Sequence, residues 1–173
     1  MRIALDIDDV LAHFMQAYCA KFNTDKYPKR LNAKVITKNV HDKLMYDKDF
    51  WLSLEVKHRP NFIPELYCTK RINPKSYTKK WLEINNFPKR PVYQMVYQNG
   101  NKATMIKGRC DVLIDDSVSN VIKAMKSGLP AILMNDKYNE YFDYPYRIYN
   151  LDIDEIHRVY EDLINNEFKG NKA

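Results

Sequence analysis

The sequence has few glycines, few cysteines and no long apolar run, and each shortage excludes a class of protein. Only 4 glycines occur in 173 residues, so the chain lacks a glycine-rich phosphate loop of the Walker or dinucleotide-binding type. The three cysteines, Cys19, Cys68 and Cys110, are an odd set without metal-ligand spacing, which favours reduced thiols over a disulfide framework. No apolar segment approaches the roughly 20 residues that cross a bilayer, so no membrane partner is expected.

The N-terminal segment argues against export. Asp6 and Asp8 interrupt the apolar stretch that a signal peptide requires. Together with the reduced cysteines, this predicts a cytoplasmic location.

Composition and charge are those of a globular protein with anionic partners. Hydrophobic residues make up 45% and charged residues 29% of the chain, enough for one core with a small appended lobe. The net charge of +6 comes mainly from the first two thirds of the sequence. A basic surface favours phosphorylated small molecules or nucleic acid. The alternative is a solvated lysine-rich surface, and charge by itself favours that alternative.

Apolar runs alternate with helical patterns along the chain. This alternation predicts an α/β fold, in which a parallel sheet is covered by helices on both faces as a Rossmann-like three-layer structure. Ligands of such sheets bind at the carboxyl ends of the strands. Strands are expected at 2–6, 65–69, 92–97, 111–115, 131–134 and 147–149, and helices at 11–22, 40–54, 76–86, from 102 onward, 117–127 and 154–167.

The first expected strand ends in the carboxylates Asp6 and Asp8. Residues two apart on an extended chain point to the same face. Two neighbouring carboxylates repel unless a cation or a proton lies between them, and an oxygen-only cluster suits Mg²⁺. The alternative is an acidic turn in which Asp8 or Asp9 caps the following helix.

Other polar residues follow further expected strands. Asp115 and Asp116 end the fourth strand, Thr69 ends the second, and Lys102 begins a short helix. Each has a structural alternative, as a helix cap, a turn residue or a surface lysine. Because paired acids end two core strands, however, a site at the sheet edge is favoured over two unrelated caps.

Together these segments resemble the haloacid dehalogenase-like phosphatase superfamily. DIDDV at 6–10 resembles its first motif, ELYCTKR at 65–71 its second, a lysine its third, and VLIDDS at 112–117 its fourth. Within the superfamily the chain is most similar to the 5'(3')-deoxyribonucleotidase family, including its bacterial and phage members. DIDDVLAHF, FWLSLEV and LIDDS are the segments that carry this closer similarity.

The resemblance implies a domain organisation. A haloacid dehalogenase-like core would comprise 1–14 and 62–173, and a small helical cap, 15–61, would be inserted after the first strand. Cap and core surfaces could each support a homodimer. A phage or bacterial member would act in the cytoplasm of the bacterial cell.

The resemblance also implies catalytic roles. Asp6 would be the nucleophile that forms an aspartyl-phosphate, and Asp8 would be the general acid and then the general base. Mg²⁺ would be bound by Asp6, by the backbone carbonyl of Asp8, and by a carboxylate of the Asp115 and Asp116 pair.

By the same resemblance, Thr69 and Lys102 would hold the phosphate, with Lys107 as a competitor for the role of Lys102. Two departures from the family pattern stand out. Asp9 replaces the commoner glycine, and Lys70 follows Thr69 where a small residue is usual, which would strengthen phosphate binding or alter selectivity.

Phe14, Phe50 and Trp51 are the candidates for stacking on a nucleotide base. The alternative is that they form the small core of the cap.

The expected function is therefore Mg²⁺-dependent hydrolysis of a nucleoside monophosphate. A polynucleotide 3'-phosphatase is the second interpretation, because the cap is rich in lysine. A non-catalytic nucleotide-binding protein is the third, although binding alone needs neither a nucleophile nor a proton shuttle.

Overall fold

The computed structural model describes residues 1–23, 43–95 and 100–169. Parts of the expected helix at 40–54 and of the expected strand at 92–97 lie outside these ranges. The strands are β1 (Ile3–Asp6), β2 (Leu66–Thr69), β3 (Val92–Gln94), β4 (Val112–Asp115), β5 (Ala131–Met134) and β6 (Arg147–Ile148). The helices are α1 (Phe14–Phe22), α3 (Lys48–Leu52), α4 (Lys75–Ile84), α5 (Lys102–Ile106), α6 (Val118–Lys126) and α7 (Ile153–Leu163), followed by a π-helical segment, η1 (Ile164–Phe168).

Within the described residues, the six strands form one parallel sheet in the order β3-β2-β1-β4-β5-β6. This confirms the predicted α/β class and is consistent with a Rossmann-like fold. The chain extends the sheet in one direction from β1 to β3 and then crosses back to β4. The order therefore reverses between β1 and β4, and the carboxyl ends of these two strands flank the crevice where ligands of such sheets bind.

Two apolar clusters cover the two faces of the sheet and make three layers. Ile3 and Leu5 of β1 face one cluster, and Ala4 between them faces the other, as expected from the two-residue period of a strand. Helices α4 and α7 contribute to the first cluster with Trp81, Leu82, Ile156, Val159 and Leu163. Helices α5 and α6 contribute to the second with Ala103, Ile106, Val121 and Ala124.

Several element boundaries differ from the predicted ones. Helix α1 begins at Phe14 rather than at residue 11, because the preceding residues form a tight turn in which the Asp9 N–H donates to the Ala12 carbonyl. Strand β3 ends at Gln94, before Met95. The last helix changes to π-helical geometry after Leu163. Helix α6 ends as predicted, because Gly128 adopts the left-handed conformation (φ 71°) that glycine accepts at a helix end.

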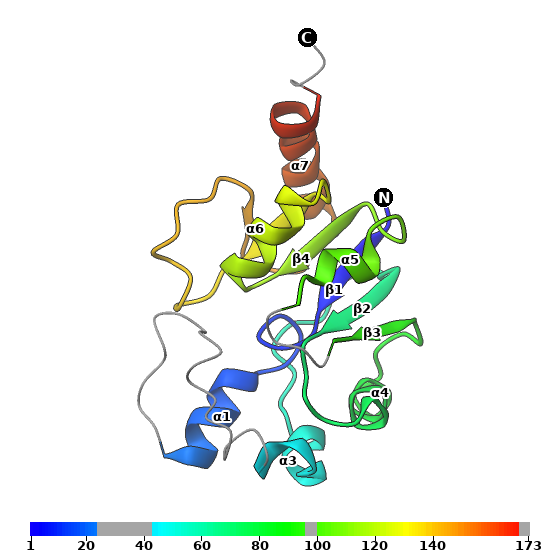
Figure 1. The fold of residues 1–173 in the computed structure, drawn as a ribbon, viewed down its shortest axis with the longest axis vertical. Coiled ribbons are helices and arrows are strands. Elements are labelled where there is room, and N and C mark those ends of the chain that lie inside the picture. The colour runs from blue at the N-terminus through cyan, green and yellow to red at the C-terminus, as the bar shows by residue number, and fades with distance from the viewer. Residues whose placement is uncertain (24–42, 96–99, 170–173) are drawn as a thin grey trace.

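Helices α1 and α3 pack against each other away from the sheet (Figure 1). The expected helix at 40–54 is interrupted: residues 43–45 are helical, and α3 begins at Lys48, where the Asp47 side chain accepts a hydrogen bond from the Phe50 N–H. The loop after α3 is tied to the core, since the Trp81 indole N–H donates to the Leu54 carbonyl over 2.8 Å. A cap at 15–61 stays a prediction, because 24–42 lie outside the described residues. None of the described helices combines the length and the apolar character needed to cross a membrane.

Candidate active site

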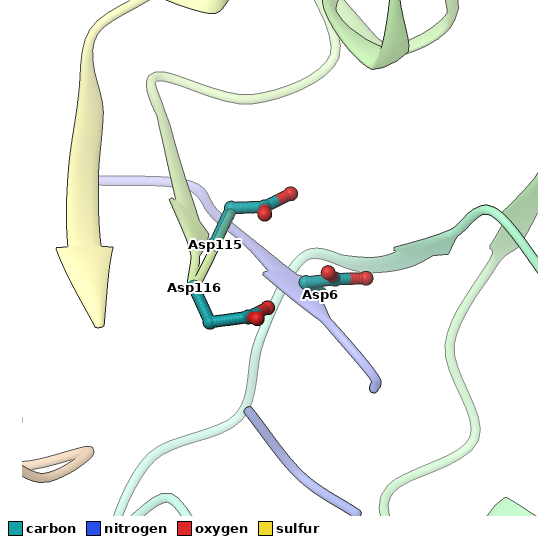
Figure 2. A group of neighbouring side chains, drawn as sticks. All are labelled: Asp6, Asp115 and Asp116. Atoms are coloured by element: carbon teal, nitrogen blue, oxygen red, sulfur yellow. The ribbon is translucent and has the colours of Figure 1, made fainter. Parts of the chain in front are cut away.

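Three aspartates converge at the carboxyl end of the sheet. Asp6 ends β1, Asp115 ends β4, and Asp116 follows it. One carboxylate oxygen from each lies within 4.8 Å of the other two, and all three residues are buried. Figure 2 shows the three side chains next to one another, with their carboxylates extending to the same side of the strand ends. The convergence lies at the reversal of the sheet order, where the topology predicts a ligand site.

Lys102 is the cation of this cluster. Its Nζ lies 2.6 Å from Oδ1 of Asp6 and 2.8 Å from Oδ2 of Asp115. The side chain is 2% exposed, because the face of α5 that carries Lys102, Ala103 and Ile106 packs on the sheet. The competing residue Lys107 points elsewhere, with its ammonium donating to the Ser127 carbonyl over 2.6 Å.

The cluster has more negative than positive charge. Three carboxylates and one ammonium carry a net charge of −2 when all are ionised. Burial, followed by the charge of Asp115, raises the pKa of Asp6 to about 7, although Lys102 opposes the shift. Burial and then Asp115 also raise the pKa of Asp116 well above its ordinary value. Burial lowers the pKa of Lys102, but Asp115 and Asp6 outweigh it and raise that pKa well above its ordinary value.

These residues fit a divalent cation. A charge of +2 would offset the excess of the cluster, and buried carboxylates retain their charge only when paired or metal-bound. The donors are all carboxylate oxygens, which Mg²⁺ prefers over nitrogen and sulfur ligands. Among the described residues no other group of histidine, cysteine and acidic side chains has comparable metal-binding geometry.

Asp8 lies next to this cluster and is held by other partners. Its side chain is partly exposed, and its two oxygens contact the guanidinium of Arg71, with Nε 2.9 Å and Nη2 2.8 Å from Oδ1. The hydroxyl of Thr69 donates to Oδ2 over 3.1 Å and accepts from the Arg71 N–H. The Asp8 carboxylate is therefore separate from the cluster of Asp6, Asp115 and Asp116, and metal binding through the Asp8 backbone carbonyl stays a prediction.

Lys70 is connected to the aspartate cluster through Asn120. The Lys70 ammonium donates to Oδ1 of Asn120 over 2.6 Å. The amide nitrogen of Asn120 donates to both oxygens of Asp115 at 3.1 Å. Burial, and secondly the nearby charge of Lys102, lowers the pKa of Lys70 to about 8. Two lysines therefore lie near the three aspartates, one in direct contact and one through an amide.

Asp9 has a structural role in the turn after β1. It adopts φ 57°, a left-handed conformation that glycine accepts most readily. Its carboxylate accepts from the Met15 N–H over 3.0 Å at the beginning of α1, and burial raises its pKa to about 8. Lys57 donates to the Asp9 carbonyl over 2.7 Å and pairs with Asp136. The capping interpretation thus describes Asp9, whereas Asp6 lies in the aspartate cluster.

The three aromatic candidates contact one another. The ring centre of Trp51 lies 5.6 Å from that of Phe14, with the rings stacked, and 5.2 Å from that of Phe50, with the rings edge to face. All three are buried, with Trp51 only 2% exposed. They form the small apolar core between α1 and α3, which was the alternative interpretation of these residues. A base-stacking role stays a prediction that requires some of these contacts to open.

Sequence reasoning did not single out Arg71 or Asn120. Arg71 follows Thr69 by two residues, so it lies beside a residue that the second motif already marked. Asn120 lies in the first turn of α6, after the paired acids, on the side that faces Asp115. The short distance of both residues from the motifs in the sequence could have marked them as site candidates. Their contacts could not be predicted, because their partners come from distant segments.

No protein-family model matches the chain, and no curated protein matches it.

Proposed function

We propose that this protein is a Mg²⁺-dependent phosphomonoesterase of the haloacid dehalogenase-like type. One observation carries the proposal. Three buried aspartates and one buried lysine, with a net charge of −2 when ionised, lie where the sheet order reverses. A cluster built only for stability would avoid uncompensated buried carboxylates, since these are costly without a cation.

Asp6 is the nucleophile in this proposal. Its carboxylate attacks the phosphorus atom, the bond to the leaving oxygen breaks, and an aspartyl-phosphate forms. The attack brings an anion toward another anion, so cationic groups must offset the repulsion. Lys102, 2.6 Å from Asp6, supplies one such charge, and the ammonium of Lys70 lies nearby to hold phosphate oxygens. The Thr69 hydroxyl would hold a phosphate oxygen only by exchanging its hydrogen bond to Asp8 for one to the phosphate.

The metal would be held by Asp6, Asp115 and Asp116. Bound there, Mg²⁺ would supply charge neutralisation and polarise the phosphoryl group. The chain itself fixes the ligands: Asn120 holds the Asp115 carboxylate through both oxygens, and the Ser117 N–H donates to Asp115 over 2.9 Å.

Asp8 is the proton carrier. It follows Asp6 by two residues and lies at the same edge of the sheet, with part of its side chain exposed. In the first step it donates a proton to the leaving oxygen, and in the second it accepts a proton from the water that attacks the aspartyl-phosphate. Thr69 and Arg71 hold its carboxylate between these steps.

A nucleoside monophosphate is the substrate proposed, and the cytoplasm the location. The substrate rests on the resemblance of the sequence and on the aromatic group that lies beside Arg71, since the guanidinium carbon is 5.2 Å from the Trp51 ring centre. The location is supported by Cys68 and Cys110, which are buried thiols outside any disulfide.

A substrate panel tests the proposal. Phosphate release is measured with Mg²⁺, and with a chelator instead, on ribo- and deoxyribonucleoside monophosphates and on a 3'-phosphorylated oligonucleotide. Metal-dependent release from the monophosphates is expected. Release from the oligonucleotide alone would assign the protein to the repair of nucleic acid ends. Binding of nucleotides without any release would indicate the non-catalytic alternative.

A further inference from the structure

Arg71 contacts Asp8 through its guanidinium, in which Nε donates to both carboxylate oxygens and Nη2 forms an ion pair with Oδ1. Nε lies 2.9 Å from Oδ1 and 3.2 Å from Oδ2, while Nη2 lies 2.8 Å from Oδ1. Such contacts between a guanidinium and a carboxylate fix the direction of the acid as well as its distance. The Arg71 side chain is fully buried, whereas the Asp8 side chain is 21% exposed. The pair therefore joins a buried cation to a partly exposed acid.

Two tryptophans hold the guanidinium in place. Its central carbon lies 5.2 Å from the ring centre of Trp51 and 5.3 Å from that of Trp81. Trp51 belongs to α3 and Trp81 to α4, so the guanidinium contacts aromatic rings from two separate helices. An arginine between aromatic rings has little rotational freedom.

The backbone of Arg71 is also fixed. Its N–H donates to the Thr69 hydroxyl over 3.1 Å, and its carbonyl accepts from the Gln94 amide over 3.0 Å. Nη1 and Nη2 are buried and make no hydrogen bond among the described residues, although Nη2 is paired in charge with Oδ1 of Asp8 at 2.8 Å. Leaving a guanidinium nitrogen unpaired is costly, so burial of this side chain is poorly explained by stability alone.

We propose that Arg71 is the positioning residue of Asp8. This inference rests on the proposed function, in which Asp8 carries the proton. An aspartate side chain that follows a strand can rotate about two bonds, and only some orientations place its oxygen at the leaving group. The guanidinium of Arg71 selects one orientation, and a misplacement of about 1 Å can cost roughly 100-fold in rate. Arg71 acts through Asp8 and need not touch the substrate.

Arg71→Lys keeps the positive charge but removes the guanidinium group. The rate of the first turnover is measured by rapid mixing with each of two substrates. A nucleoside monophosphate has a leaving oxygen that needs a proton, whereas a nitrophenyl phosphate does not. The first turnover of the nucleotide should slow roughly 10- to 100-fold, that of the aryl ester by less than about threefold, and KM should change by less than about threefold. In an Asp8→Asn background, Arg71→Lys should change neither rate by more than about twofold.

Arg2→Lys is the matched control. Arg2 makes a similar contact with Asp111, with Nη2 2.8 Å from Oδ1, but next to the amino ends of β1 and β4. This variant should leave both rates unchanged. If Arg71→Lys does not fold, Trp81→Phe, which retains an aromatic ring beside the guanidinium, should give a smaller loss with the same preference for the nucleotide.

Equal losses on both substrates, or losses that add fully to those of Asp8→Asn, would overturn the positioning role and leave the proposed function standing. If Asp6→Asn released phosphate at the wild-type rate, the proposed function would be overturned, and this inference with it.

Discussion

Nζ of Lys102 and Oδ1 of Asp6 lie 2.6 Å apart in the interior of the protein. Lys102 begins α5 and Asp6 ends β1, so the two residues are far apart in the sequence. The same ammonium lies 2.8 Å from Asp115. It is the cation that makes a cluster of three buried carboxylates tolerable, and the proposed metal site and phosphate site both depend on it.

Removal of that cation should destabilise the fold. Lys102→Met leaves Asp6, Asp115 and Asp116 without their ammonium, and breaking a buried ion pair in this way costs roughly 3–5 kcal/mol of unfolding free energy. Mg²⁺ should restore part of the loss by binding the folded state alone. Urea unfolding with and without Mg²⁺ measures both effects. Lys107→Met is the control, and a Lys102→Met protein as stable as this control would contradict the account.

Mg²⁺ affinity should depend on Asp116. Asp116→Asn removes one of the three carboxylates, so the net charge of the ionised cluster falls from −2 to −1. Titration calorimetry should show the affinity for Mg²⁺ reduced roughly 100-fold or more, since both a ligand charge and a ligand atom are lost. Asp111→Asn, before β4, should bind Mg²⁺ as the wild type does. Equal affinities for the two variants would exclude Asp116 from the site.

The activity should depend on pH through Lys70. Because burial and Lys102 lower its pKa to about 8, Lys70 is cationic below that pH and loses its charge above it. The protonated form is the one that binds phosphate, so kcat/KM should fall roughly tenfold as the pH rises from 7 to 10. An arginine side chain at this position would stay charged throughout that range, so the profile of Lys70→Arg should lack this fall. Parallel profiles for the two proteins would rule out a charge role for Lys70.

Asp9 should tolerate asparagine but not alanine. Asparagine accepts the left-handed conformation at φ 57° and retains an acceptor for the Met15 N–H. Alanine loses the acceptor and is strained, so Asp9→Ala should lower the free energy of unfolding by about 2–3 kcal/mol, and Asp9→Asn by less than about 1 kcal/mol. Denaturant unfolding compares them. Two variants of equal stability would show that the Asp9 side chain does not cap α1.

The strands and the acidic residues at their ends could be predicted from the sequence. Apolar runs such as Ile3–Asp6 bury every residue, as a central parallel strand requires. Topology then brings Asp6 and Asp115 together, because both follow adjacent parallel strands. Of the two lysines considered, Lys102 lies on the buried face of α5 and contacts Asp6 and Asp115, whereas its role toward phosphate stays a prediction.

The partners of these residues could not be predicted in the same way. The position of Arg71 depends on two tryptophans from different helices, and a strand-end pattern carries no information about them. The expected helix at 40–54 is interrupted after the helical residues 43–45, because Asp47 caps a new helix, α3, that begins at Lys48. Local propensity is overridden there by a side chain that competes for backbone N–H groups.

The role of Asp6 is the central claim, and one comparison tests it. Phosphate release from a deoxyribonucleoside monophosphate is followed with Mg²⁺ for the wild type, for Asp6→Asn and for the control Asp111→Asn, after circular dichroism has verified that all three are folded. The account predicts turnover by the wild type and the control, and a loss of roughly 1,000-fold or more for Asp6→Asn. An Asp6→Asn protein that releases phosphate at the wild-type rate would contradict it.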